Sequence, residues 1–299
     1  MVGEYGISSL RIAYSLKDPN IFSSEIMMKY FDLHEPEQIT YDGNFKLTPI
    51  FFPNGNDQSK ELLYVSYQNG IPKIFKRSIH TNDSKPLISL RGNQILPSIS
   101  PNGEFLSFIS DVSGTIDLFL QKLSKNLETI GKPIQLFSSS DSVQASSSFH
   151  PQLEHIAFVS DMERRPKIFK LDLLKTLKAR KKTDVFLISP SQSEATCPAF
   201  SPDGTKMAYS SLVDGVRQIF VYDLTQQLHY PLTDGPHHKE NPSFAPNSLH
   251  IVYNTTCTEN ELYVINLHQK KPIKITQGSG FKHYPCWEQI KKRKIKDLS

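Results

Sequence analysis

The sequence is poor in cysteine and contains no long apolar run. Its three cysteines are an odd number without a Cys-x-x-Cys pair, so neither a disulfide framework nor a cysteine-based zinc site is indicated. No stretch approaches the roughly 20 apolar residues of a membrane-spanning helix. The first residues, MVGEYGISSLRIAYS, lack the basic and then apolar pattern of an export signal. We therefore expect a soluble chain.

Catalytic motifs are also scarce. The sequence has no Gly-x-Ser-x-Gly nucleophile elbow, no His-Glu-x-x-His motif and no phosphate-binding glycine motif. The two histidines of HPQLEH (150–155) are five positions apart across a turn, and we interpret them as structural. The cluster HHKEN (237–241) could supply metal ligands or titrating contacts, but a solvated loop is the simpler interpretation. We predict no catalytic residue, no metal and no cofactor.

Positive charge is concentrated in two short runs. Residues 174–184 (LKTLKARKKTD) and 290–299 (IKKRKIKDLS) each have a net charge of +4, which equals the net charge of the whole chain. The rest of the chain is therefore net negative, and nucleic-acid binding is not indicated. The two runs are either solvated loops or a weak contact for an anionic surface.

One short pattern recurs along the whole chain. It reads CPAFSPDGTKMAYSS at 197–211, and each variant places a short apolar run around a first proline, followed by a turn and a second apolar run. The first proline position is occupied by Pro49, Pro97, Ser147, Pro198, Pro242 and Pro285, with spacings of 43 to 51 residues. A period of about 40 to 50 residues made of short strands is typical of a β-propeller blade.

Counting the predicted strands gives the number of blades. Each repeat resolves into four strand-like runs separated by turn residues, and each kind of run occurs six times. The chain begins with a second-strand run at 10–15 and ends with a first-strand run at 284–289. We therefore predict an all-β, six-bladed β-propeller with four antiparallel strands per blade. Its C-terminal strand 284–289 completes the N-terminal blade of residues 10–40, so that no sheet edge stays open.

The predicted domain is a single propeller over residues 1–290, followed by the basic tail 291–299. An innermost strand faces the central channel with one edge, so a proline there loses no hydrogen bond between strands. Two positions after the first proline, each repeat has a bulky side chain on the same strand face. These residues are predicted to pack between blades: Phe51, Ile99, Phe149, Phe200, Phe244 and Trp287.

The repeats resemble a known family. The pattern P-x-[apolar]-x-P-[DN]-G, followed by an apolar run and then by stretches such as RPKIFKLDL (165–173), resembles the β-propeller of TolB, the periplasmic component of the bacterial Tol-Pal system. The resemblance extends from about residue 10 to residue 289 and is most specific in 148–173, 197–224 and 285–287. Similar WD40-like repeats occur in the lid domains of prolyl-oligopeptidase-like enzymes, so the repeat alone does not decide function.

The resemblance implies a non-enzymatic protein-binding propeller. It implies a monomer in the periplasm that binds a Pal-like peptidoglycan-associated lipoprotein, with other Tol proteins as further partners, in cell-envelope integrity and protein transport. The alternatives are a lid or remnant domain of a prolyl-oligopeptidase-like hydrolase and a small-molecule hydrolase that uses the channel. The TolB family has an export signal and a small α/β domain ahead of its propeller. We expect this chain to lack both, which leaves the cytoplasm as an alternative location.

The two faces of the predicted ring differ in chemistry. Connections from a fourth strand to the next first strand emerge at one end of the channel, the channel mouth, whereas the SPDG turns and the basic runs lie on the opposite face. Converging loops on a rigid scaffold suit a protein or peptide partner, and the resemblance implies that Pal binds at this mouth. By position, the predicted partner-binding residues are Asn93, Gln94, Glu194, Thr196, His238, Glu240, Asn241, Lys282, His283 and Tyr284.

Overall fold

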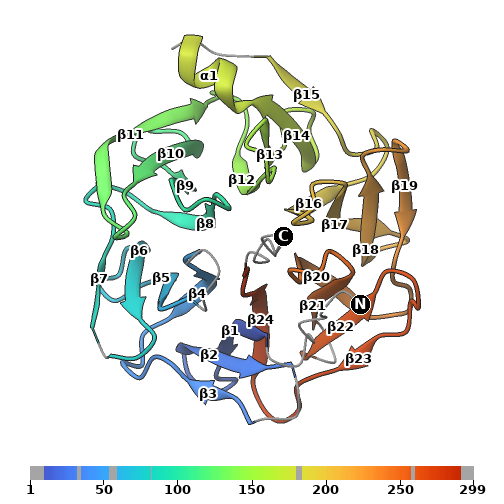
Figure 1. Cartoon of the computed structure of the whole chain (residues 1–299), viewed down its shortest axis with the longest axis horizontal. Coiled ribbons are helices and arrows are strands. Elements are labelled where there is room, and N and C mark those ends of the chain that lie inside the picture. The colour runs from blue at the N-terminus through green and yellow to red at the C-terminus, as the bar shows by residue number, and fades with distance from the viewer. Residues whose placement is uncertain are drawn as a thin grey trace, which may run out of the picture.

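The computed structural model describes residues 10–31, 35–53, 59–81, 83–179, 184–256 and 260–290. These residues form six four-stranded antiparallel sheets, arranged as the blades of a ring (Figure 1). The predicted six-bladed β-propeller is therefore confirmed. Within the described ranges, no helix has the length and apolar character that crossing a membrane requires.

Each blade is built outwards from a strand at the channel. From the inside, blade 1 contains β24 (Phe281–Trp287), β1 (Arg11–Lys17), β2 (Ser24–Tyr30) and β3 (Glu37–Gln38). Blade 2 contains β4 (Lys46–Phe51), β5 (Glu61–Ser66), β6 (Lys73–Ser78) and β7 (Ser84–Pro86). Blade 3 contains β8 (Ile95–Ile99), β9 (Phe105–Ser110), β10 (Asp117–Leu123) and β11 (Thr129–Phe137).

The second half of the ring has the same order. Blade 4 contains β12 (Gln144–Phe149), β13 (His155–Ser160), β14 (Lys167–Asp172) and β15 (Val185–Leu187). Blade 5 contains β16 (Ala195–Phe200), β17 (Lys206–Val213), β18 (Val216–Asp223) and β19 (Leu228–Pro231). Blade 6 contains β20 (His238–Phe244), β21 (His250–Thr256), β22 (Leu262–Asn266) and β23 (Ile273–Lys274).

The C-terminal strand closes the ring as predicted. Strand β24 pairs antiparallel with β1, and the two strands lie side by side at the inner edge of blade 1 (Figure 1). Next to this seam, the buried Arg11 guanidinium donates from Nη2 to Glu288 Oε1 (2.6 Å) and from Nε to Glu288 Oε2 (2.8 Å). Arg11 Nη2 also donates to the backbone carbonyl of Ser59 in blade 2 (2.7 Å). The ion pair therefore joins both ends of the described chain to the neighbouring blade.

The hydrophobic core is divided among the contacts between blades. The described residues form six hydrophobic clusters, and each combines side chains of two neighbouring blades. Phe200 of blade 5, for example, packs with Ala157 and Val159 of blade 4. Trp287 is fully buried in a cluster with residues of blade 6. The predicted packing of the bulky inner-strand residues between blades is confirmed, with Ile99 only partly buried against its cluster.

Each inner strand contains a β-bulge directly before its first proline position. In blade 6, for example, the pairing between β20 and β21 shifts by one residue between Glu240 and Ser243. The residue before the proline has a left-handed backbone, with φ between 49° and 55°, at Thr48, Leu96, Cys197, Asn241 and Tyr284. The extra residue reverses the alternation of faces along the strand. Consequently, the side chain three positions before the proline is buried between blades, at Lys46, Gln94, Gln144, Ala195, Lys239 and Lys282.

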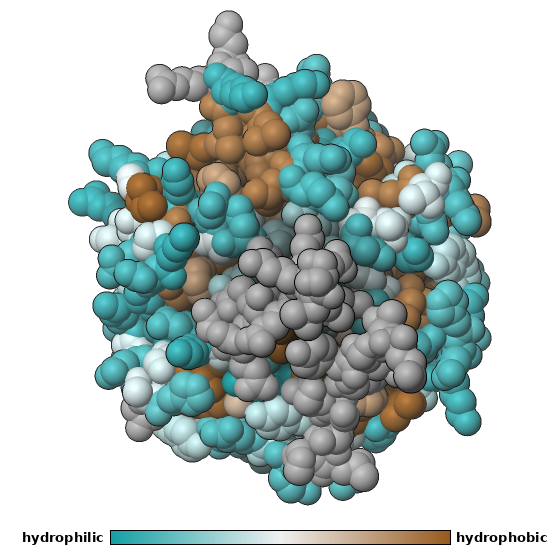
Figure 2. Space-filling view, viewed as in Figure 1, coloured by the Kyte–Doolittle hydropathy of each residue, from teal (hydrophilic) through white to brown (hydrophobic). Residues whose placement is uncertain are grey.

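The basic run 174–184 is not simply a solvated loop, which was one of its two interpretations, because part of it is helical. It begins within helix α1 (Leu173–Ala179), which starts where Asp172 Oδ1 accepts a hydrogen bond from the Lys175 backbone N–H (2.8 Å). Leu173 and Leu177 pack against the core between blades 3 and 4, which explains the helix. Hydrophobic side chains gather near α1 on the face shown in Figure 2. Residues 180–183 and the tail 291–299 lie outside the described residues.

Candidate functional site

The inner strands enclose a central channel with a cavity volume of about 1160 Å³. Its wall includes the inner-strand prolines Pro49, Pro97, Pro198, Pro242 and Pro285. Because proline has no backbone N–H, these positions offer the channel no backbone hydrogen-bond donor. Polar side chains line the channel along its length, and one group of them lies at the mouth between blades 5 and 6. We define the mouth cluster as Thr196, Arg217, Glu240, Asn241 and Tyr284, all of which line the channel.

Arg217 connects the mouth cluster to the surrounding loops. It lies near the start of β18, and its guanidinium forms ion pairs with Glu194 (Nη2 to Oε2, 3.2 Å) and Glu240 (Nε to Oε1, 3.4 Å). Its Nη1 lies 3.4 Å from Thr196 Oγ1. The two glutamates belong to neighbouring blades, so the arginine fixes the position of one blade edge relative to the next. Thus the structure brings three predicted residues, Glu194, Thr196 and Glu240, together around an arginine that was not predicted.

The cluster HHKEN does not form the expected solvated loop, because strand β20 begins at His238. The His238 Nδ1 atom accepts a hydrogen bond from the Arg217 backbone N–H (3.0 Å), which ties β20 to β18 of blade 5. Lys239 is buried, and its Nζ donates to the carbonyl of Gly235 (3.2 Å). These residues therefore fix the start of the inner strand.

Asn241 and Tyr284 occupy the left-handed bulge positions at the mouth. Asn241 Oδ1 accepts a hydrogen bond from the Cys197 thiol (3.3 Å), and Asn241 Nδ2 donates to Asn254 Oδ1 (2.9 Å). Burial raises the pKa of the Cys197 thiol, so the sulfur stays protonated at neutral pH. Burial, with a smaller effect of the negative charge at Glu240, raises the pKa of Tyr284 to about 12. Tyr284 therefore remains a neutral phenol that can both donate and accept a hydrogen bond.

Gln94 and Lys282, two of the predicted partner-binding residues, have buried side chains. Both occupy the position three before the first proline, and the bulge turns their side chains between the blades, where they are 0% and 3% exposed. Gln94 Nε2 donates to the carbonyl of Leu90 (3.0 Å). Lys282 Nζ contacts Glu261 Oε1 (3.1 Å). These side chains hold the mouth loops in place from behind, and we leave them out of the proposed binding surface.

Asn93 and His283 lie near the mouth but are not among the residues that line the channel. Both the backbone N–H and the side-chain amide of Asn93 donate to the Asp111 carboxylate (2.7 and 2.6 Å), so this residue ties two loops of blade 3 together. The His283 ring stacks near Phe281, with ring centroids 6.3 Å apart. Burial, with a smaller effect of the positive charge of Lys17, lowers the pKa of His283.

A local signal for Arg217 was present in the sequence. Asp214 and Gly215 have φ values of 49° and 81°, as a two-residue β-hairpin turn of type I′ requires. The short turn extends β17 and β18 to eight residues each and carries Arg217 to the channel mouth. An Asp-Gly pair between two apolar runs is a recognised hairpin signal. The prediction considered only the connections between fourth and first strands, whereas Arg217 follows a connection between second and third strands.

The closed ring of six sheets makes the chain a six-bladed β-propeller, and its central cavity has polar residues at the mouth. A family model described as the TolB beta propeller domain matches residues 1–291. The chain therefore belongs to the TolB β-propeller family.

Individual relatives agree with this assignment. The chain is 40% identical to a TolB homolog of Protochlamydia amoebophila over 247 residues, which are 81% of this chain and 53% of that protein. It is 34% identical to a TolB homolog of Chlamydia pneumoniae over 301 residues, covering 99% of this chain and 68% of that protein. The chain thus spans about half to two thirds of the length of these relatives.

Among solved structures, TolB from Acinetobacter baumannii has the same fold. The two structures superpose with a TM-score of 0.78 over 96% of this chain and 69% of that chain, at 22% sequence identity. At this identity the similarity supports the fold and not the details of the site.

Proposed function

We propose that this chain is a non-enzymatic, protein-binding propeller. It receives a Pal-like peptidoglycan-associated lipoprotein at the channel mouth and acts in the periplasm in the maintenance of the cell envelope. The observation that carries the proposal is the mouth cluster, in which Arg217, Glu240 and Tyr284 lie together at the entrance of a wide channel.

The size of the channel and the residues at its mouth suit a protein partner. The cavity of about 1160 Å³ is larger than the 300 to 1000 Å³ typical of small-molecule pockets, and it accommodates a loop or a chain end. Tyrosine and arginine are the side chains that most often anchor protein interfaces. Arg217 and Tyr284 are partly buried and are held by the surrounding blades, so little side-chain entropy is lost when a partner binds.

The charge of the mouth indicates which groups a partner would present. Two carboxylates, Glu194 and Glu240, surround the single guanidinium of Arg217, which leaves one negative charge in excess. A partner segment with a lysine, an arginine or several N–H donors would compensate this charge. We therefore expect binding to weaken as the salt concentration rises.

The family match favours this role over the two alternatives, a hydrolase lid and a channel-site hydrolase. Cys197 at the channel wall is not suited to be a nucleophile, because the thiolate is the reactive form and burial raises the pKa of this thiol.

The test is the affinity of the purified full chain for the peptidoglycan-associated lipoprotein of the same organism. The double variant Glu240→Ala/Tyr284→Ala should raise the Kd at least about 10-fold, because both side chains line the mouth. The control variant Lys175→Ala/Lys178→Ala changes exposed residues of α1, on the opposite face, and should bind normally. Unchanged affinity of the folded mouth variant, or an equal loss in the control, would contradict the proposal.

A further inference from the structure

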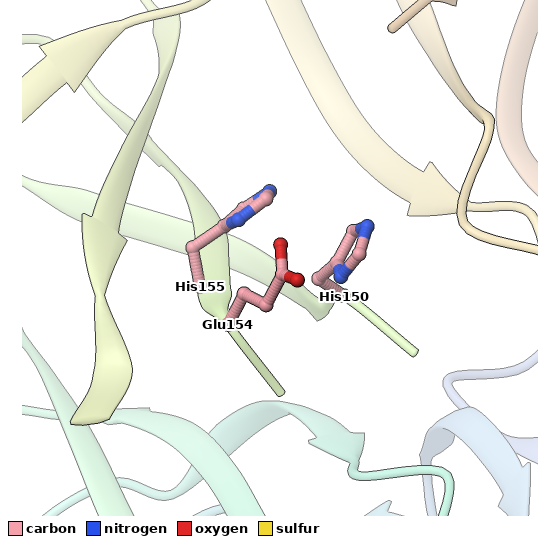
Figure 3. A group of neighbouring side chains, drawn as sticks. All are labelled: His150, Glu154 and His155. Atoms are coloured by element: carbon pink, nitrogen blue, oxygen red, sulfur yellow. The ribbon is translucent and has the colours of Figure 1, made fainter. Parts of the chain in front are cut away.

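The two histidines of HPQLEH lie together on the face opposite the mouth. They flank the turn between β12 and β13, and the His150 backbone N–H donates to the His155 carbonyl (3.0 Å). Their rings stack with centroids 4.5 Å apart. The Glu154 carboxylate lies close to both rings (Figure 3). One nitrogen or oxygen atom from each of the three residues lies within 4.8 Å of the others.

His150 has a free coordination position. The residue is only 7% exposed, and its Nδ1 atom is buried without a hydrogen-bond partner among the described residues. Its Nε2 atom lies 3.3 Å from the carbonyl oxygen of Gly204 in blade 5, to which a protonated Nε2 donates. That hydrogen bond leaves the lone pair on Nδ1. Metal-binding histidines are typically oriented in this way, with the second ring nitrogen bonded to a backbone carbonyl or a carboxylate.

The next blade supports this geometry. The Phe200 ring lies roughly perpendicular to both imidazole rings, with centroid distances of 5.3 Å to each. A Cβ atom at Gly204 would lie 3.1 Å from His150 Nε2 and 2.7 Å from Gln152 Oε1, so the absence of a side chain there permits the close approach. The His150 ring is therefore held at a fixed orientation by two residues of blade 5.

This turn differs from the corresponding turns of blades 3 and 5, whereas the turns of blades 2 and 6 also lack the serine and have Phe52 and Ala245 in its place. In blade 5, Ser201 Oγ donates to Asp203 Oδ1 (2.6 Å), and in blade 3 Ser100 bonds to Asn102 in the same way. In blade 4 the serine is replaced by His150, so this stabilising bond is not formed. Leu153 also has a φ of 58°, where the turns of blades 3 and 5 use glycine and that of blade 6 uses Ser248 with a φ of 57°. In place of the serine bond, His150 contacts Gly204 and Phe200 of blade 5.

We propose that His150, Glu154 and His155 bind one divalent ion of the Zn²⁺ class. Two imidazoles and one carboxylate are a common ligand set for Zn²⁺, with a fourth position left to water. Mg²⁺ and Ca²⁺ prefer oxygen ligands alone. With metal-ligand distances of about 2.0 to 2.2 Å, the ligand atoms of a tetrahedral site lie about 3.3 Å apart. Metal binding would therefore require the His155 and Glu154 side chains to rotate towards His150, whose ring is held by blade 5. The bound ion would fasten the blade 4 hairpin, which already contacts blade 5 through His150.

The test is a calorimetric titration of the untagged full chain with Zn²⁺, with Co²⁺ as a spectroscopic probe of tetrahedral coordination. We expect one ion per chain. Glu154→Gln changes an exposed side chain and should fold normally, but it should bind Zn²⁺ at least about 10-fold more weakly. His150→Ala/His155→Ala should abolish this binding.

The matched control is His80→Ala/His268→Ala, which removes two exposed histidines and should keep full affinity. Zn²⁺ should also raise the Tm of the unaltered chain and of the control more than that of Glu154→Gln, because binding to the folded state stabilises it. Absence of Zn²⁺ binding by the unaltered chain would overturn the proposal. Equal affinity in the unaltered chain and in Glu154→Gln or the double histidine variant would also overturn it.

Discussion

Arg11 and Glu288 form a buried ion pair at the point where the two ends of the chain meet. The carboxylate accepts two hydrogen bonds from the guanidinium, and Glu288 is fully buried. The guanidinium also lies over the ring of Phe51, 5.4 Å from its centroid. Because Glu288 follows the last residue of β24 directly, this pair secures the strand that completes blade 1.

Replacing Glu288 by alanine should therefore reduce the free energy of unfolding by about 3 to 5 kcal/mol, because Arg11 would remain as a buried charge without its partner. Urea denaturation followed by tryptophan fluorescence measures the change, since the single tryptophan, Trp287, is adjacent to the site. Lys271→Ala, at an exposed position, is the control and should change stability by less than about 0.5 kcal/mol. A similarly small effect of Glu288→Ala would show that the pair does not secure the closure.

The orientation of a side chain follows from the sequence where the strand alternation is regular, but not where the bulge interrupts it. Phe200 and Trp287 follow the first proline by two positions, and both pack between blades as expected. Counting backwards from the proline at a period of two would place Gln94 and Lys282 on the other strand face, whereas the bulge reverses their orientation. The bulge has no glycine in this chain to reveal it, because its left-handed position is occupied by residues as different as Leu96 and Tyr284.

Among the strands, β17, β18 and β19 of blade 5 share a partly buried histidine, His229. The Tyr209 hydroxyl lies 3.0 Å from His229 Nδ1, and the His229 ring stacks on Tyr222 with a centroid distance of 4.1 Å. Either atom can be the donor of this hydrogen bond, because a tyrosine hydroxyl both donates and accepts. Burial lowers the pKa of His229, which favours the neutral ring in the folded chain.

This arrangement predicts a loss of stability in acid. The unfolded chain binds a proton at His229 near the usual pKa of about 6.5, whereas the folded chain binds it only at lower pH, so acidification favours unfolding. The contribution of neutral His229 to the free energy of unfolding is complete above about pH 6.5. It is lost as the pH falls towards the lowered pKa of the folded chain. The drop in Tm between about pH 7.5 and about pH 5.5 should be smaller for His229→Gln than for the unaltered chain. His268→Gln, at an exposed position, should leave the drop unchanged. Equal drops for all three proteins would contradict this account.

The strand order could be predicted from the sequence, but the outer elements could not be placed accurately. Inner and second strands are bounded by prolines and turn residues, which mark their limits. The outermost strands β3 and β23 contain only two residues each, because few backbone pairs form at the rim. Helix α1 was hidden in a basic run, since its formation depends on Leu173 and Leu177 packing against the neighbouring core. Such tertiary packing cannot be predicted from the local composition of the run.

For the whole molecule, counting repeats was sufficient to predict the ring, because a chain that starts with a second strand and ends with a first strand closes in one way. The mouth cluster required the three-dimensional structure. Arg217 forms ion pairs with Glu194 of its own blade and with Glu240 of the next blade. The two glutamates do not occupy equivalent positions of the repeat, so the repeat pattern does not predict that they meet. The sequence therefore indicated which face of the ring has the mouth loops, but not that Arg217 connects them.

Cross-linking to the lipoprotein tests the proposed binding face most directly. A photoreactive phenylalanine analogue would replace either Tyr284, which lines the mouth, or Leu249, which is exposed in a turn of blade 6 on the opposite face. Each protein would be irradiated with the purified peptidoglycan-associated lipoprotein, and the adducts would be identified by mass spectrometry. Our account predicts an adduct from position 284 and none from position 249. An adduct from position 249 alone, or equal yields from both positions, would contradict binding at the channel mouth.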